Sequence, residues 1–309
     1  MRIVVALGGN AMLERGQKPD ARIQIDNVNT AVDALAPVAE EHELVITHGN
    51  GPQVGVIALQ SANDPKLSEP YPFDTLGAMT QGMIGYWLQH ALKNALPDRE
   101  VVCTINQTLV DADDPAFDNP TKFVGEVYTE EQAKEFEAER GWVMKADGPY
   151  FRRVVGSPIP KSIVEIKTIK ELVGAGTTVI CSGGGGIPVK QDESGKLVGV
   201  EAVIDKDRSG AVLSEELGAD MFIVLTDVPA VMENWGTPEQ REINRATPDE
   251  LREQGFAAGS MGPKVEAAIQ FVEATGGVAA IGRLADAQKI IAGEAGTIIT
   301  RDGTYPREA

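Results

Sequence analysis

Cysteine and histidine are scarce in this chain, which has two cysteines and three histidines among its 309 residues. Cys103 and Cys181 do not form a Cys-x-x-Cys pair, which argues against a disulfide framework and against a cysteine-based zinc site. The histidines are too few and too scattered to indicate a histidine-rich metal site. We therefore expect a protein of a reducing compartment and predict that it is cytoplasmic.

Long apolar runs and positive charge are also lacking. The sequence nowhere reaches the roughly 18 consecutive apolar residues that a membrane-spanning helix needs. The apolar run at residues 3–7 stops at Gly8, so it is too short for a signal peptide and predicts a buried strand. Lys and Arg number 28 against 46 Asp and Glu, giving a formal charge of −18. Because nucleic acids and anionic membranes attract basic surfaces, we expect neither as a partner.

The acidic balance has two explanations, and the charge alone does not separate them. A protein from a high-salt cytoplasm carries excess acid because salt screens the repulsion between the side chains. An ordinary acidic enzyme of the cytosol can have the same composition. The two differ in how melting temperature depends on salt.

Hydrophobic residues make up 42% of the chain, and its 33 glycines cluster where apolar runs end. Short β-branched runs followed by glycine loops are typical of buried parallel strands that end at a ligand crevice. Amphipathic helix patterns alternate with these runs, which predicts an α/β fold with a mostly parallel sheet. The predicted strands are 3–7, 44–47, 101–105, 177–181, 221–225, 278–281 and 297–300. The predicted helices are 25–41, 75–96, 161–173, 207–217, 247–254, 262–274 and 284–291.

One segment interrupts this alternation. Residues 112–160 hold several prolines and a charged helix pattern at 130–140, and we interpret them as a small lobe inserted at the edge of the sheet. The whole chain, 1–309, is expected to form a single domain that contains this lobe. Turn residues at 192–195 between two short polar–apolar stretches predict a β-hairpin.

The glycine loops are suited to binding phosphate, because a glycine turn after a strand lets backbone N–H groups approach an anion. They match neither the P-loop pattern nor Gly-x-Gly-x-x-Gly. Lys264 opens a predicted helix, where the helix dipole disfavours a cation, so we favour a functional role for this lysine. Lys206 lies between Asp205 and Asp207, and a local salt bridge is the simpler explanation for it.

Nine segments together carry a family resemblance that spans nearly the whole chain. They closely resemble the carbamate kinases of the amino-acid kinase superfamily and occur in the same order, at residues 8–11, 48–55, 77–86, 119–122, 152–155, 183–189, 201–207, 225–228 and 259–266. The resemblance implies an open αβα sandwich and a homodimer. It also implies the reversible reaction of ATP with carbamate to give ADP and carbamoyl phosphate, with Mg²⁺ held mainly by the nucleotide phosphates.

The resemblance also implies roles for individual residues. The transferring phosphoryl group would lie between two sets of loop residues, namely Gly8, Gly9 and Asn10 on one side and Gly49, Asn50 and Gly51 on the other. Lys206 and Lys264 would neutralise the phosphates, Asp207 would orient these lysines, and Lys122 on the inserted lobe would reach carbamate or carbamoyl phosphate. The nucleotide side would be lined by Thr226, Asp227, Val228, Met261 and Gly262.

Two other functions are compatible with the same fold. One is a different amino-acid kinase, which would phosphorylate an amino-acid carboxylate or a phosphate monoester; the segment around Lys122 and the lack of a C-terminal regulatory extension argue against it. The other is a catalytically inactive nucleotide sensor, which loss of a lysine at 206 or 264, or of Asp207, would favour.

The sequence departs from the family motif at one position of the inserted lobe, since Lys122 is followed by Phe123, where the family usually has proline.

Overall fold

A mostly parallel sheet forms the centre of the protein, whose computed structural model describes residues 1–14, 16–256 and 261–305, apart from the side chains of Asn10 and Glu126. Within these residues the sheet has eight strands in the order β15-β17-β16-β12-β1-β2-β9-β3. Its pairs are parallel except β16 with β17, which confirms the predicted fold class. The strands are β1 Arg2–Leu7, β2 Glu43–His48, β3 Val101–Cys103, β9 Thr178–Ile180, β12 Met221–Thr226, β15 Arg245–Ala246, β16 Val278–Arg283 and β17 Thr297–Ile299.

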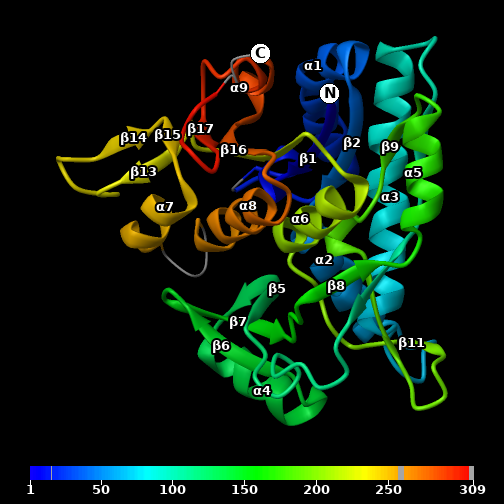
Figure 1. The fold of residues 1–309 in the computed structure, drawn as a ribbon. Coiled ribbons are helices and arrows are strands. Elements are labelled where there is room, and N and C mark those ends of the chain that lie inside the picture. Colours follow the sequence, from blue (N-terminus) through cyan, green and yellow to red (C-terminus); the bar gives the residue numbers. More distant parts are fainter. Residues whose placement is uncertain (15, 257–260, 306–309) are drawn as a thin grey trace.

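Helices cover both faces of this sheet (Figure 1). The alternating side chains of β1 show that both faces are buried. Ile3, Val5 and Leu7 join one core cluster, whereas Val4 and Ala6 join the other. Each face of the strand is therefore buried, as expected for a parallel sheet in the middle layer of an αβα sandwich. The first face packs against α1 Ala21–Glu41, α3 Phe73–Ala95 and α9 Ala287–Ile291, and the second against α5 Ile166–Gly174, α6 Lys206–Leu217, α7 Pro248–Gln254 and α8 Gly262–Thr275.

Smaller sheets extend the structure beyond the carboxyl ends of the central strands. A four-stranded sheet has the order β11-β10-β4-β8 and a two-stranded sheet pairs β13 with β14. The strands β10 and β11 are antiparallel around residues 192–196, as the predicted hairpin requires. The bounds are β4 Gln107–Val110, β8 Pro160–Ile163, β10 Ile187–Gln191, β11 Leu197–Gly199, β13 Val231–Glu233 and β14 Arg241–Ile243, with short 3₁₀ turns η1 Gly9–Ala11, η2 Gly183–Gly185 and η3 Leu284–Asp286.

A separate three-stranded sheet lies within the segment that interrupts the α/β alternation. It has the order β5-β7-β6, with β5 Lys122–Tyr128, β6 Val143–Asp147 and β7 Tyr150–Val155, and α4 Glu130–Arg140 packs on it (Figure 1). Strand β5 contacts α2 Gly51–Asn63, where a Cβ on Gly55 would lie 2.1 Å from the Cα of Gly125. Glycine at position 55 is thus required for the two backbones to approach, and this approach sets the position of β5 beside the central sheet.

Two expectations for individual elements were wrong or incomplete. The helix predicted at 161–173 begins only at Ile166, because residues 160–163 form β8, which pairs with β4. Helix α2 was not predicted, since its first residues, Gly51 and Pro52, resemble a loop in sequence. Pro52 instead occupies the first turn, where a missing N–H costs no hydrogen bond. Helix α1 continues past Pro37 to Glu41.

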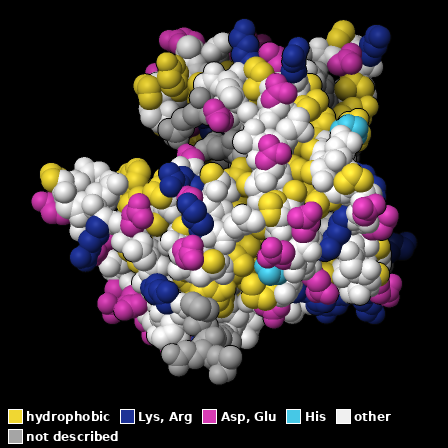
Figure 2. Space-filling model, turned by 90° about the horizontal axis from the view of Figure 1, so that it is seen from above, with side chains coloured by type: hydrophobic (Ala, Val, Ile, Leu, Met, Phe, Trp, Pro, Cys, Tyr) yellow, Lys and Arg dark blue, Asp and Glu magenta, His cyan; other side chains and the backbone are white. Residues whose placement is uncertain are grey.

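Charged side chains of both signs are interspersed over the surface drawn in Figure 2. Some form close pairs, such as Arg252 with Glu273, whose guanidinium and carboxylate make two contacts of 2.7 Å. None of the helices within residues 1–14, 16–256 and 261–305 is both long enough and apolar enough to cross a membrane.

Candidate active site

Two glycine loops lie side by side because the strands that carry them are parallel neighbours. The register pairs Leu7 of β1 with His48 of β2, so Gly8 and Gly49 begin their loops at the same edge of the sheet. A Cβ on Gly49 would lie 3.3 Å from the amide nitrogen of Gly9 and 3.4 Å from Cδ of Lys206. The two loops and the stem of this lysine are therefore in close contact. Gly51 follows as the first residue of α2.

The neighbouring strand on the other side brings the predicted nucleotide residues to the same edge. The amide of Gly8 donates to the carbonyl oxygen of Leu225 on β12 at 3.0 Å. Thr226 ends this strand, and its hydroxyl donates to the Asp227 carboxylate at 3.1 Å. The loops after β2, β1 and β12 thus form a continuous row along the carboxyl edge of the sheet, which is where ligands bind in open α/β folds.

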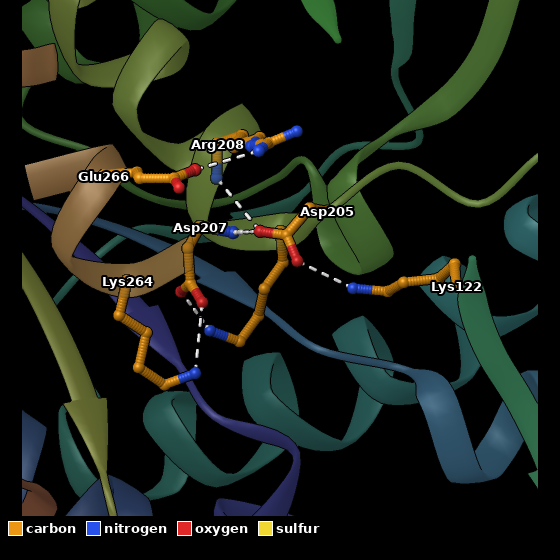
Figure 3. A network of polar contacts seen from close by, with 7 residues as sticks. Lys122, Asp205, Asp207, Arg208, Lys264 and Glu266 are labelled. Atoms are coloured by element: carbon orange, nitrogen blue, oxygen red, sulfur yellow. Dashed lines mark hydrogen bonds and ion pairs between the residues drawn. The ribbon is translucent and has the colours of Figure 1, made fainter. Parts of the chain in front are cut away.

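Two lysines converge on one buried carboxylate in this row (Figure 3). Asp207, in the first turn of α6, is 2% exposed. One of its carboxylate oxygens accepts a hydrogen bond from Lys206, and the other accepts from Nζ of Lys264 in the first turn of α8 at 3.3 Å. The local salt bridge expected for Lys206 does form, and the same carboxylate orients the second lysine.

A third lysine reaches this cluster from the separate sheet. Nζ of Lys122, the first residue of β5, donates to Oδ2 of Asp205 at 2.7 Å (Figure 3). The other oxygen, Oδ1, accepts from the amides of Asp207 and Arg208 at 3.0 and 3.2 Å, so Asp205 is the N-cap of α6. Asp205 was not among the predicted site residues, because its link to Lys122 joins segments far apart in the sequence.

Burial and charge shift the ionisation of these groups in opposite ways. Burial lowers the pKa of the Lys206 ammonium, while the adjacent Asp207 carboxylate counteracts that shift. Burial alone would raise the pKa of Asp205, but the charge and hydrogen bond of Lys122 outweigh it and hold that pKa well below its usual range. Asp205 is therefore a carboxylate at neutral pH.

Helix α3 and the glycine turn after β9 support the loop after β2. Nδ2 of Asn50, which is 5% exposed, donates to the hydroxyl of Thr80 on α3 at 2.8 Å. A Cβ on Gly183 would lie 2.3 Å from the ring of His48, so these residues are tightly packed. Burial lowers the pKa of His48 to about 4, which leaves a neutral imidazole at neutral pH.

A cavity of about 350 Å³ with apolar and polar lining residues lies at the start of α8, the helix that carries Lys264. Met261 lines it, and the amide of Lys264 donates to the carbonyl oxygen of Met261 at 3.1 Å, so cavity and lysine are adjacent. Trp235, which is 67% exposed, also borders it. The full lining is Val228, Met232, Asn234, Trp235, Gln254, Gly255, Phe256 and Met261. The sequence prediction included Val228 and Met261 but missed Trp235. The one feature that could have indicated Trp235 is that a large aromatic residue stands in an otherwise polar, glycine-containing turn.

The structure therefore brings most of the predicted site residues together at one edge of the sheet. Gly262, the first residue of α8, directly follows Met261 at the cavity. The backbone of Asn10 lies in η1, while its side chain falls outside the described part of the structure, as do residues 259–260 of the last motif. Among the described side chains, no three of His, Cys, Asp and Glu gather where they could hold a metal ion.

Comparisons with known proteins agree with this geometry. The sequence profile of the amino acid kinase family matches residues 1–281. A curated carbamate kinase of Rhizobium meliloti is 53% identical, over 97% of this chain and 93% of its own length. That of Escherichia coli K12 is 50% identical, over 96% and 99%. The solved carbamate kinase of Giardia lamblia bound to AMP-PNP superposes with a TM-score of 0.89 at 40% identity, covering 97% of this chain and 98% of its own. The chain belongs to the amino acid kinase family and, within it, to the carbamate kinases.

Proposed function

We propose that the chain catalyses reversible phosphoryl transfer between ATP and carbamate, giving ADP and carbamoyl phosphate. The observation that carries this proposal is the carboxylate of Asp207, which holds Lys206 and Lys264 together beside the loops of Gly9 and Gly49. A pair of fixed cations next to backbone amides is suited to a transferring phosphoryl group. The carbamate kinases among the relatives, at 50% identity and above, support the same activity.

The chemistry needs little beyond position and charge. In the forward direction a carbamate oxygen forms a bond to the γ-phosphorus of ATP, and the bond from that phosphorus to the bridging oxygen breaks. Because carbamate is already an anion, its oxygen needs no general base, and the neutral, buried His48 has no proton to take up. Lys206 and Lys264 would stabilise the negative charge that spreads over the phosphoryl oxygens. Their positions are set before substrate binds, so reorganisation costs little.

Mg²⁺ fits this site as a companion of the nucleotide. Asp205 and Asp207 are both engaged by lysines, so neither offers a free carboxylate to a metal. Mg²⁺ usually keeps several waters and takes phosphate oxygens as ligands. We therefore propose that the nucleotide phosphates would hold Mg²⁺ here, where it would add positive charge at the β- and γ-phosphates.

The nucleotide and the small substrate would approach from different sides. The cavity bordered by Trp235 and Met261, which offers apolar surfaces and a few polar groups, is suited to a purine base, with the phosphates extending toward Lys264. Thr226, Asp227, Val228 and Gly262 would complete that side. Gly8, Gly9, Asn10, Gly49, Asn50 and Gly51 would hold the phosphoryl group. We propose that residues 112–160 act as a lobe inserted in a single domain, 1–309, and that Lys122 brings its charge to carbamate or carbamoyl phosphate.

We also propose that the protein is a homodimer of the cytoplasm. Met79 and Tyr86 lie seven residues apart on α3, hence near the same side of that helix, and are 46% and 61% exposed. Strand β3 packs against α3, and Ile105, just beyond this strand, is 57% exposed. Exposed apolar side chains on neighbouring elements are suited to a second copy of the chain. Mass measurement in solution tests this, since a monomer at micromolar concentration would contradict it.

ATP formation by the purified protein tests the proposed reaction. With Mg²⁺, ADP and carbamoyl phosphate, we expect ATP to accumulate, while acetyl phosphate in place of carbamoyl phosphate gives little. Equal rates with the two phosphoryl donors would contradict specificity for the carbamoyl group. No ATP from either donor would contradict the proposed function itself.

A further inference from the structure

Asp205 performs two tasks with its two carboxylate oxygens. Oδ1 caps the N-terminus of α6, and Oδ2 accepts the hydrogen bond from Lys122. We propose that Asp205 is a positioning residue that holds Lys122 at the small-substrate side of the site. This inference rests on the proposed function and adds a residue to which no role had been given.

The capping hydrogen bonds fix the carboxylate of Asp205, which can then hold the flexible side chain of Lys122. A lysine side chain loses considerable rotamer freedom when it is held in one place. Asp205 is 15% exposed and already oriented by two backbone amides, so most of that entropic cost falls on Lys122 alone. The ammonium group has three N–H donors and Asp205 takes one of them. Lys122, at 34% exposed, keeps the others available to a substrate.

The pair also removes a repulsion that the substrate would otherwise meet. Asp205 lies in the same cluster as Lys206 and Asp207, and besides Lys122 the charge of Lys206 and the amide of Arg208 also lower its pKa and favour the ionised form. An unpaired carboxylate here would repel carbamate and carbamoyl phosphate, both of which are anions. The charge of Lys122 cancels this repulsion. Asp205 and Lys122 therefore act as one unit. Without the lysine the carboxylate would repel the substrate, and without the carboxylate the lysine would lose its fixed position.

A second set of contacts keeps the three-stranded sheet in place independently of this pair. The guanidinium of Arg153 on β7 lies 4.7 Å from the ring centroid of Phe73, at the start of α3. Glu201 is 3.7 Å from the same guanidinium and accepts from the amide of Phe73 at 2.8 Å. Loss of the Asp205 carboxylate should therefore free the side chain of Lys122 without releasing the sheet. We therefore expect the KM for carbamoyl phosphate to change and the KM for ADP to stay nearly the same.

Asp205→Asn is the variant that separates these tasks, because asparagine caps a helix as well as aspartate does. We expect its KM for carbamoyl phosphate to rise about tenfold or more, the effect of losing a charge-assisted hydrogen bond, and its KM for ADP to stay within about twofold. Asp205→Ser, which also caps but cannot reach Lys122, should behave alike. The control is Asp111→Asn, which removes a carboxylate paired with Lys161 at 2.5 Å on the surface and should leave both KM values unchanged.

A double-variant cycle shows whether Asp205 acts through Lys122. In Lys122→Ala the carboxylate is unpaired, so adding Asp205→Asn should leave KM for carbamoyl phosphate equal to that of Lys122→Ala or lower it. Additive losses, equal rises in both KM values, or a lower KM in Asp205→Asn alone would each overturn the inference. These outcomes are read against wild-type ATP formation, so failure of the proposed function appears separately, as a wild-type enzyme without activity.

Discussion

Lys264, in the first turn of α8, donates to one carboxylate oxygen of Asp207 in the first turn of α6, while Lys206 donates to the other. The two helices are also joined at this end by Arg208 and Glu266, whose charged groups are 2.9 Å apart. One buried carboxylate thus sets the distance between two cations that come from separate helices. Transfer of a phosphoryl group between two bound substrates requires that this distance stay constant.

Replacement of Lys264 tests the role of this cation. Lys264→Ala should lower kcat by about two orders of magnitude or more, because it removes a charge that stabilises the transition state. The melting temperature should change little, since Asp207 keeps Lys206 as a partner. Steady-state kinetics and thermal unfolding measure the two effects. The matched control is Glu266→Gln, which breaks the other contact between these helices; a comparable fall in kcat there would assign the effect to helix placement.

Replacement of Trp235 tests the nucleotide side. Trp235→Ala should raise KM for ADP about tenfold, the usual effect of losing an aromatic surface on which a base stacks, and leave KM for carbamoyl phosphate unchanged. Trp235→Phe keeps an aromatic ring and should restore most of the affinity. If KM for ADP is the same in the alanine variant, the cavity beside Met261 does not hold the base.

The stability of the protein should decrease in mild acid because of His48. Its pKa is lowered from 6.5 to about 4 by burial, so below pH 6.5 the unfolded chain binds a proton that the folded chain does not. The free energy of unfolding should therefore fall by about 3 kcal/mol in total as the pH drops from 6.5 to 4. Asp205, whose pKa is lowered, adds a loss of stability that begins as the pH falls toward the usual aspartate pKa and continues below it, so the His48 effect is read most clearly in the upper part of its window.

Denaturant titrations across pH 4 to 7 measure this effect, with His48→Gln as the variant. The glutamine variant should lose the part of the slope between pH 6.5 and 4, and His42→Gln, directly after α1, controls for the loss of a histidine. Identical slopes in wild type and His48→Gln would show that His48 is not responsible.

Salt should act on stability and on affinity in opposite directions. A chain with a net charge of −18 repels itself, so the melting temperature should climb as KCl rises from about 0.05 to about 2 M if the protein is adapted to salt. KM for carbamoyl phosphate should rise over the same series, because salt screens the lysine cluster. A melting temperature that is flat in KCl would identify an ordinary acidic enzyme and leave the catalytic account unchanged.

Local patterns predicted the central layer well. Runs such as 3–7 and 221–225 can be recognised as strands by themselves, because a run of β-branched residues that ends in a glycine loop or a polar turn is seldom a helix or a loop in an α/β chain. The start of α2 could not be found in this way, because Gly51 and Pro52 resemble a loop in sequence, while the packing of β5 on this helix joins distant segments. Residues 160–163 form a strand for a similar reason, namely that β4 is available as a partner.

Some of the site residues could likewise be predicted from local patterns, and others could not. Glycine loops and lysines are visible in the sequence as motifs, and the resemblance to carbamate kinases gave them roles. Contacts that join distant segments are not visible, since neither the hydrogen bond of Lys122 to Asp205 nor the position of Trp235 at the cavity leaves a pattern in the chain. These residues act through tertiary packing, which a single sequence does not show.

The central claim is that the row of glycine loops and the paired lysines transfer a phosphoryl group directly between carbamoyl phosphate and ADP. Phosphorus NMR of the protein with Mg²⁺ and both substrates measures this most directly, because each phosphorus species has its own signal. The account predicts that each carbamoyl phosphate consumed by the enzyme yields one ATP, and that Lys264→Ala slows both changes equally. Enzyme-dependent release of inorganic phosphate from carbamoyl phosphate without formation of ATP would contradict it.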